Sequence, residues 1–172
     1  MKHSTALPAA WILLRILIIL NWVIGGLIAA LLISTLVARE WTFTALGIGP
    51  QDQIRSIIVG LQLVAALGLA TIPLNHGMFT RMLRIVETVR LGEPFVAANA
   101  YRLNAIAWIL LALQIISMII GGIGRVVSTP HHPLHLDAGF SWTGWLAVAL
   151  TFVLARVFAE GTLMREDLEG TI

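Results

Sequence analysis

The chain has 172 residues, of which 58% are hydrophobic and 12% charged, with a formal net charge of +2. Soluble domains carry about a quarter charged residues, so this composition excludes an ordinary soluble protein and predicts a single membrane domain over residues 1–172. The basic residues form no run, and we predict no direct nucleic-acid binding. Cysteine is absent, which excludes disulfides, thiolate metal sites and thiol catalysis.

Four apolar stretches predict transmembrane helices at about 16–38, 57–76, 103–123 and 140–159. Each is long enough to cross a hydrocarbon core of roughly 30 Å at ~1.5 Å per residue. The predicted fold class is therefore all-α, a polytopic membrane protein. Lys2 precedes the first stretch as in a secretory signal, but the stretch is too long for one. Leu36 also stands where a cleavage site needs a small residue, so we predict an uncleaved first span.

The Lys and Arg residues predict how the spans are oriented. If both termini are cytoplasmic, eight of the 11 Lys and Arg residues lie inside: Lys2, Arg15, Arg81, Arg84, Arg90, Arg102, Arg156 and Arg165. The outside then holds Arg39, Arg55 and Arg125. Short cytoplasmic loops carry such an excess of positive residues. We therefore predict a multi-pass protein of the cell inner (plasma) membrane with cytoplasmic N- and C-termini.

The connection between the second and third spans, residues 76–104, is the most patterned segment outside the membrane. Its apolar residues recur at helical spacing, as Phe79, Met82, Leu83, Val86 and Val89. Gly92, with Pro94 shortly after it, is a helix stop signal. The pattern predicts a cytoplasmic amphipathic helix that turns back at residues 92–95. This helix either lies in the membrane interface or extends the second span.

The outer loop between the third and fourth spans offers three imidazoles and a carboxylate, from His131, His132, His135 and Asp137. Such ligands suit zinc or copper. However, Pro130 and Pro133 break any helix there, and no ligand from a second element is evident. We therefore predict an exposed loop without a tight metal, and no cofactor. A metal site and a pH-responsive loop are the alternatives.

Among the polar residues within the spans, Asn21, Gln62 and Gln114 lie at different depths. Each is expected to hydrogen-bond a neighbouring helix, and for Gln114 we predict an interior position with Thr151 as its partner. No charged residue falls at mid-membrane depth, where ion-coupled transporters place theirs. No nucleophile is paired with a base. The sequence therefore predicts neither an ion-coupled carrier nor an enzyme.

Two segments carry a more specific signal. The first is Leu91-Gly92-Glu93-Pro94-Phe95, followed by Asn99, Arg102-Leu103-Asn104 and Trp108. The second is the tail, Val157-Phe158-Ala159-Glu160-Gly161, then Leu163, Arg165-Glu166-Asp167 and Gly170-Thr171-Ile172. Both resemble segments of an uncharacterised bacterial membrane family, domain of unknown function 2975. The resemblance implies four spans with a patterned second-to-third connection. Members are often encoded beside a small helix-turn-helix regulator, which implies a regulatory role; the resemblance implies no catalytic residue.

These segments define candidate partner-docking residues on the cytoplasmic face: Arg90, Gly92, Glu93, Pro94, Phe95, Asn99, Arg102, Arg165, Glu166 and Asp167. We predict a membrane-embedded regulatory or interaction protein of unknown biochemical activity, which sequesters or signals to a small cytoplasmic helix-turn-helix regulator. A homo-oligomer is a further expected assembly in the lipid bilayer. The alternative is a small oligomeric transporter or permeation subunit.

The same residues also have a structural interpretation. Gly92 permits a left-handed turn, Pro94 starts the next helix and Phe95 packs into the interface. In the tail, Arg156 and Glu160 stand four residues apart and are expected to pair along one helix face. The acidic cluster of the tail is also expected, as one alternative, to lie against the basic second-to-third connection.

Overall fold

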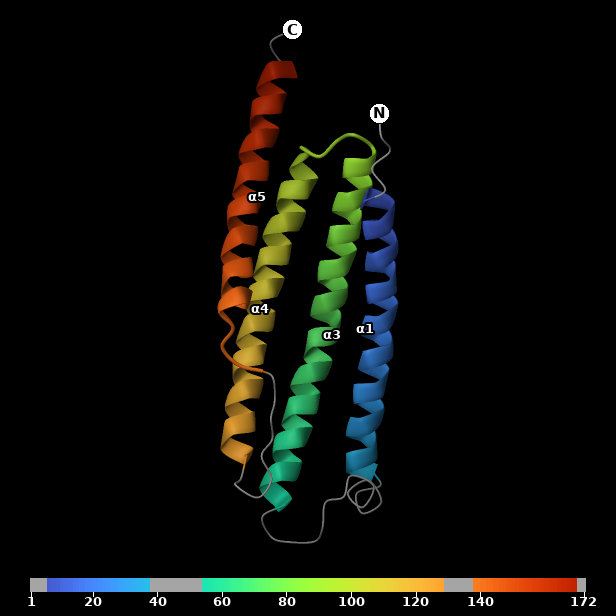
Figure 1. Cartoon of the computed structure of the whole chain (residues 1–172), viewed down its shortest axis with the longest axis vertical. Coiled ribbons are helices and arrows are strands. Elements are labelled where there is room, and N and C mark those ends of the chain that lie inside the picture. Colours follow the sequence, from blue (N-terminus) through green and yellow to red (C-terminus); the bar gives the residue numbers. More distant parts are fainter. Residues whose placement is uncertain (1–5, 38–53, 129–137, 170–172) are drawn as a thin grey trace. The chain divides into compact units, whose positions relative to one another are not determined.

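The computed structural model describes residues 6–37, 54–128 and 138–169, and its regular structure there is helical throughout (Figure 1). Helix α1 spans Ala6–Val37, α3 spans Ile54–Arg90, α4 spans Ala97–Val127 and α5 spans Trp142–Glu169. All four are long and apolar enough to cross a membrane. The predicted all-α fold with four spans is confirmed, and the chain is a multi-pass membrane protein.

Each helix is longer than the apolar stretch that predicted it. α1 begins at Ala6, before the predicted start near residue 16, and α5 continues to Glu169, past the predicted end near residue 159. α3 has 37 residues, roughly 55 Å at ~1.5 Å per residue against a hydrocarbon core of roughly 30 Å. The second span and the amphipathic connection are therefore one continuous helix, the second of the two predicted forms.

The residues group into two compact units. Unit 1 comprises residues 1–20, 74–113 and 141–172, and unit 2 comprises residues 21–73 and 114–140. Helices α1, α3 and α4 contribute to both units, and α3 passes from one to the other at Pro73, which lies inside this helix. The single membrane domain over the whole chain stays a prediction.

Close contacts at small and polar residues hold α1 and α3 together in unit 2. Gly25 lies against Ile72, so that an added Cβ would be 3.1 Å from Ile72 Cγ1. Buried Asn21, one turn earlier, donates a 3.0 Å hydrogen bond from Nδ2 to the carbonyl of Ile72. Helices in a bilayer associate through such close packing and interhelical hydrogen bonds. The prediction that Asn21 bonds a neighbouring helix is confirmed.

Gln114 lies in the interior, as predicted, with 8% of its surface exposed. Its predicted hydrogen bond to Thr151 is wrong. Among the described residues Gln114 Nε2 has no partner, and the Thr151 hydroxyl donates a 2.7 Å bond to the carbonyl of Ala147. That carbonyl lies one turn earlier in the same helix, where a threonine hydroxyl reaches it without help from another element. The local acceptor therefore satisfies Thr151.

We expect Gln114→Leu to raise the free energy of unfolding by about 1 kcal/mol, because a buried amide nitrogen without an acceptor, such as Gln114 Nε2, costs ~1–3 kcal/mol. Asn21→Leu is the matched control, since it removes an amide that does donate to Ile72 and should lower the free energy of unfolding. Reversible unfolding in mixed micelles, followed by circular dichroism, measures both changes. A clear loss of stability in both variants would contradict the prediction.

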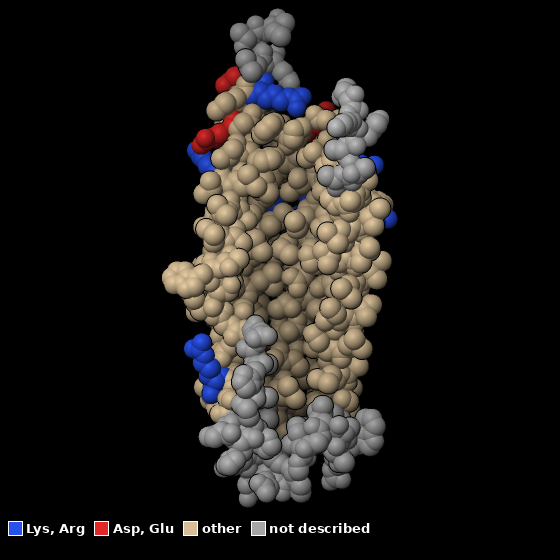
Figure 2. All heavy atoms as spheres, viewed as in Figure 1, with Lys and Arg blue, Asp and Glu red and all other residues tan. Residues whose placement is uncertain are grey.

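The charged side chains are divided unevenly between the units. In unit 2, Arg125 is the single charged side chain that the structure describes. In unit 1, charged side chains gather at the end where α3 turns into α4, while the flank below is almost free of them (Figure 2). The α4–α5 contact in that flank is apolar, with Trp108 and Phe152 meeting edge to face at 5.4 Å between ring centroids. Unit 1 therefore combines a lipid-compatible flank with a charged end.

Candidate functional site at the turn between α3 and α4

A tightly closed turn ends α3 at Gly92. The N–H of Gly92 donates to the carbonyl of Val89 at 3.1 Å, and the N–H of Glu93 donates to the carbonyl of Thr88 at 3.0 Å. These are the two bonds of a Schellman motif, which satisfies the last carbonyls of a helix. Gly92 has a φ of +83°, in the left-handed region that glycine adopts without a Cβ clash. The left-handed turn predicted at Gly92 is confirmed.

Asn99 braces this turn from the first turn of α4, and its side chain is fully buried, at 0% exposed. Its Nδ2 donates to the Thr88 hydroxyl at 2.7 Å and to the Pro94 carbonyl at 2.9 Å. Its Oδ1 accepts a 2.8 Å bond from Nη1 of Arg102. A side chain without exposed surface cannot contact a partner. The structure therefore gives Asn99 a bracing role in place of the expected docking role.

Phe95 fastens the turn to α5. Its ring centroid lies 5.3 Å from that of Phe158, with the rings tilted at 36°. It also lies against Gly161, where an added Cβ would be 3.0 Å from Phe95 Cδ1. Phe95 therefore packs against α5 with 42% of its surface exposed, and its packing into the membrane interface stays a prediction. The two segments singled out by resemblance, distant in sequence, thus meet through an aromatic contact.

The outer edge of the turn is exposed. Leu91 is 78% exposed, and the neighbouring Arg90 and Glu93 are exposed as well. The backbone that carries these side chains is held by the Schellman bonds, by Asn99 and by Phe95. A loop fixed in this way loses little conformational freedom on binding, which favours recognition. Leu91 and Glu93 are therefore the side chains of the turn best placed to contact a partner.

The charged residues of the tail lie on the last turns of α5. Arg165 and Asp167 are exposed, and the side chain of Glu166 lies outside the described residues. The predicted pair is present, with Arg156 Nε 2.7 Å from Glu160 Oε1. Because both side chains are at least half exposed, such a pair contributes only ~0.3–0.5 kcal/mol. It orders the surface of α5 more than it stabilises the fold.

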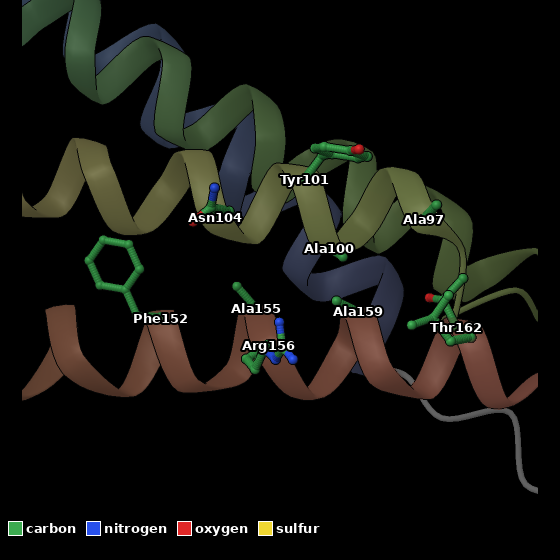
Figure 3. Close-up of a pocket in the computed structure, with 10 residues that line it drawn as sticks. Ala97, Ala100, Tyr101, Asn104, Phe152, Ala155, Arg156, Ala159 and Thr162 are labelled. Atoms are coloured by element: carbon green, nitrogen blue, oxygen red, sulfur yellow. The ribbon is translucent and has the colours of Figure 1, made fainter.

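A pocket of about 530 Å³ opens between α4 and α5 beside the turn (Figure 3). Ala155 and Ala159 point from α5 towards Ala100 of α4, and these small side chains leave the space open. Tyr101 lies at its edge, and Phe152 closes the apolar end. The pocket is therefore a groove of mainly apolar lining, here called the α4–α5 groove, that begins beside the charged end of unit 1.

The candidate metal ligands His131, His132, His135 and Asp137 lie outside the described residues. Within residues 6–37, 54–128 and 138–169, no three His, Asp or Glu side chains come together as metal ligands would. The prediction for the histidine loop therefore stays a prediction.

Two residues that hold the site together were not among the sequence candidates. Thr88 accepts from Asn99 while its own hydroxyl donates to the carbonyl of Ile85 at 2.8 Å, and helical spacing alone does not distinguish it from other surface threonines. For Gly161 the sequence does offer an indication of its role. A glycine inside a helix costs about 1 kcal/mol relative to alanine, so its presence indicates close packing.

Comparison with known proteins adds no relative. No protein-family model matches the chain, and no curated protein or solved structure matches it either. The resemblance to domain of unknown function 2975 stays a prediction from the two segments quoted above. The geometry of the site is therefore the main evidence on the function of the chain.

Proposed function

We propose that the chain is a membrane-embedded interaction protein that holds a soluble partner at one end of unit 1. This docking end comprises residues 90–96 of the turn and residues 160–169 of α5. The partner that the family resemblance implies is a small helix-turn-helix regulator, which would be sequestered or signalled to at the membrane. In this proposal both termini and the docking end face the cytoplasm from the inner membrane.

The observation that carries the proposal is the contact of Phe95 with Phe158 and Gly161. It brings the two segments with family-like sequence into one surface. Because Asn99 and the Schellman bonds fix the turn, Leu91 and Glu93 are presented on a rigid backbone. A preordered surface of this kind is suited to protein recognition.

The distribution of charge supports the proposed orientation. Three parts of the chain lie at the same end of unit 1 (Figure 1). They are the start of α1, the turn between α3 and α4, and the end of α5. The arginines on this end include Arg84, Arg90 and Arg165. Positive residues near span ends favour the cytoplasmic side.

Site-specific photo-crosslinking in intact cells tests the proposal. A photoreactive amino acid at position 91 should capture a soluble protein, because Leu91 is 78% exposed on the docking end. The same amino acid at position 126 is the matched control, since Val126 is 85% exposed and belongs to unit 2. Capture of the same protein from both positions would indicate non-specific contact and count against the proposal.

Variants then separate docking from folding. Leu91→Ser combined with Glu93→Ala changes two exposed side chains and should reduce recovery of the partner roughly tenfold, as expected for an interface hot spot. Arg125→Ala, an exposed residue of unit 2, should leave recovery unchanged. Quantitative mass spectrometry of the purified complexes measures both. Full recovery with the double variant, at normal membrane levels, would contradict the proposal.

A further inference from the structure

A second pocket of unit 1, of about 490 Å³, lies between α3 and α4 and is strongly basic. Its lining includes Arg81, Arg84 and Arg102, together with His76, Thr80 and Tyr101. No carboxylate is among the lining residues. We call it the basic pocket. Its size falls within the range of roughly 300–1,000 Å³ typical of small-ligand sites.

The three guanidinium groups of the basic pocket keep most of their donors free within the described part of the chain. Arg81 donates to the carbonyl of Gly77 at 2.9 Å. Arg102 donates to Asn99 Oδ1 at 2.8 Å and more weakly, at 3.4 Å, to the carbonyl of Arg84. Each guanidinium carries five N–H donors. Three neighbouring positive charges without a described carboxylate partner favour an anion with several oxygen acceptors, and phosphate has this chemistry.

The position of the basic pocket along α3 favours a phosphate that belongs to a lipid. If the second span ends near residue 76, as predicted, Arg81 lies roughly 8 Å beyond the hydrocarbon core at ~1.5 Å per residue. The headgroup region of each leaflet is roughly 5–8 Å thick. The pocket lining, from His76 at the predicted edge of the core to Arg84 roughly 12 Å beyond it, therefore spans the level of the lipid phosphates.

The α4–α5 groove also favours a lipid as the source of the phosphate. Tyr101 lines both the basic pocket and the α4–α5 groove. A lipid whose phosphate occupies the basic pocket would therefore have a largely apolar groove beside it for an acyl chain. Free phosphate would use the basic pocket alone.

We propose that the basic pocket binds a phosphate group, supplied by the headgroup of an anionic phospholipid of the surrounding leaflet. Basic pockets between transmembrane helices are known to bind such headgroups. This inference goes beyond the proposed docking function and needs no protein partner.

Arg84→Gln is the test variant, because the Arg84 side chain is exposed and donates no hydrogen bond to another described residue. Its replacement removes a charge without removing a structural contact. Arg90→Gln is the matched control: it makes the same change on the same helix, at an exposed position that does not line the pocket. Equal elution profiles and helicity in detergent establish that both variants fold.

Native mass spectrometry of the purified chain measures retained phosphatidylglycerol, with phosphatidylcholine of the same acyl chains as the neutral comparison. We expect the parent and Arg90→Gln to retain phosphatidylglycerol over phosphatidylcholine, and Arg84→Gln to bind it roughly tenfold more weakly, the effect of one lost charge-assisted contact. A parallel arm measures thermal stabilisation by inorganic phosphate.

Each result bears on the proposal. Loss of phosphatidylglycerol in Arg84→Gln alone, with no stabilisation by inorganic phosphate, supports a lipid headgroup site. Stabilisation of the parent by inorganic phosphate, lost in Arg84→Gln and without any preference for phosphatidylglycerol, overturns the lipid source and assigns the pocket to free phosphate. Equal binding of phosphatidylglycerol by the parent and both variants overturns the site.

Discussion

Asn99→Ala is expected to lower the free energy of unfolding by about 3 kcal/mol, because it removes three hydrogen bonds from a fully buried position. The Pro94 carbonyl loses its side-chain donor, and Arg102 loses its acceptor on Asn99. The turn also loses the hydrogen bond from Asn99 to Thr88, which connects α4 with α3. Reversible unfolding in mixed micelles measures the change. Partner recovery at the docking end should fall with it, since the backbone under Leu91 and Glu93 is no longer braced.

Asn104→Ala is the matched control for this prediction. Asn104 lies on the same helix and is exposed, and its side chain makes no hydrogen bond with the described residues, so its replacement should change the free energy of unfolding by less than ~0.5 kcal/mol. A double-mutant cycle with Thr88→Val isolates the bond between Thr88 and Asn99. If Asn99→Ala and Asn104→Ala unfold with the same free energy, the network contributes no net stability.

The four spans could be predicted because the bilayer imposes a length and a composition on them. The ends of the helices depend on local chemistry that hydropathy does not register. α5 begins where the Ser141 hydroxyl accepts a 3.1 Å bond from the N–H of Gly144, an N-cap. α3 ends where Gly92 adopts a positive φ. Where no such signal stops the helix, the polar ends of α3 and α5 remain helical beyond the apolar stretches that predicted them.

The sequence predicts those features of the site that depend on residues close together in the chain. It does not predict the contacts between residues that are distant in the chain. Gly92 and Phe95 followed from turn chemistry and from the apolar character of phenylalanine. Asn99 was assigned to a docking surface, because a polar residue close to the membrane surface has the same local pattern whether it is exposed or buried. In the structure Asn99 is buried and donates a hydrogen bond to Thr88 on the preceding helix. Likewise, the fit of Phe95 beside Gly161 arises from two segments that no periodicity connects.

Gly121→Ala is expected to lower the free energy of unfolding by about 2 kcal/mol, within the range for overpacking a close contact. In unit 2, α4 approaches the segment 138–140 so closely that a Cβ at Gly121 would lie 2.7 Å from the Cα of Gly139. The obstructing atoms belong to backbone, which cannot rotate away as a side chain would. Ser117 also anchors this segment, since its hydroxyl accepts a 3.3 Å bond from the N–H of Gly139. The added methyl group must therefore displace an anchored chain.

Gly122→Ala provides the control, because a Cβ at this exposed neighbour meets nothing within 4 Å. The same change there should be neutral or stabilise by up to ~1 kcal/mol, through the higher helix propensity of alanine. A second measurement covers the case in which the segment simply moves aside. Because the chain has no cysteine, Phe140→Cys introduces a single thiol whose labelling rate should rise with Gly121→Ala and not with Gly122→Ala. Equal stabilities and equal labelling rates in the two variants would show that α4 and the segment 138–140 are not in close contact.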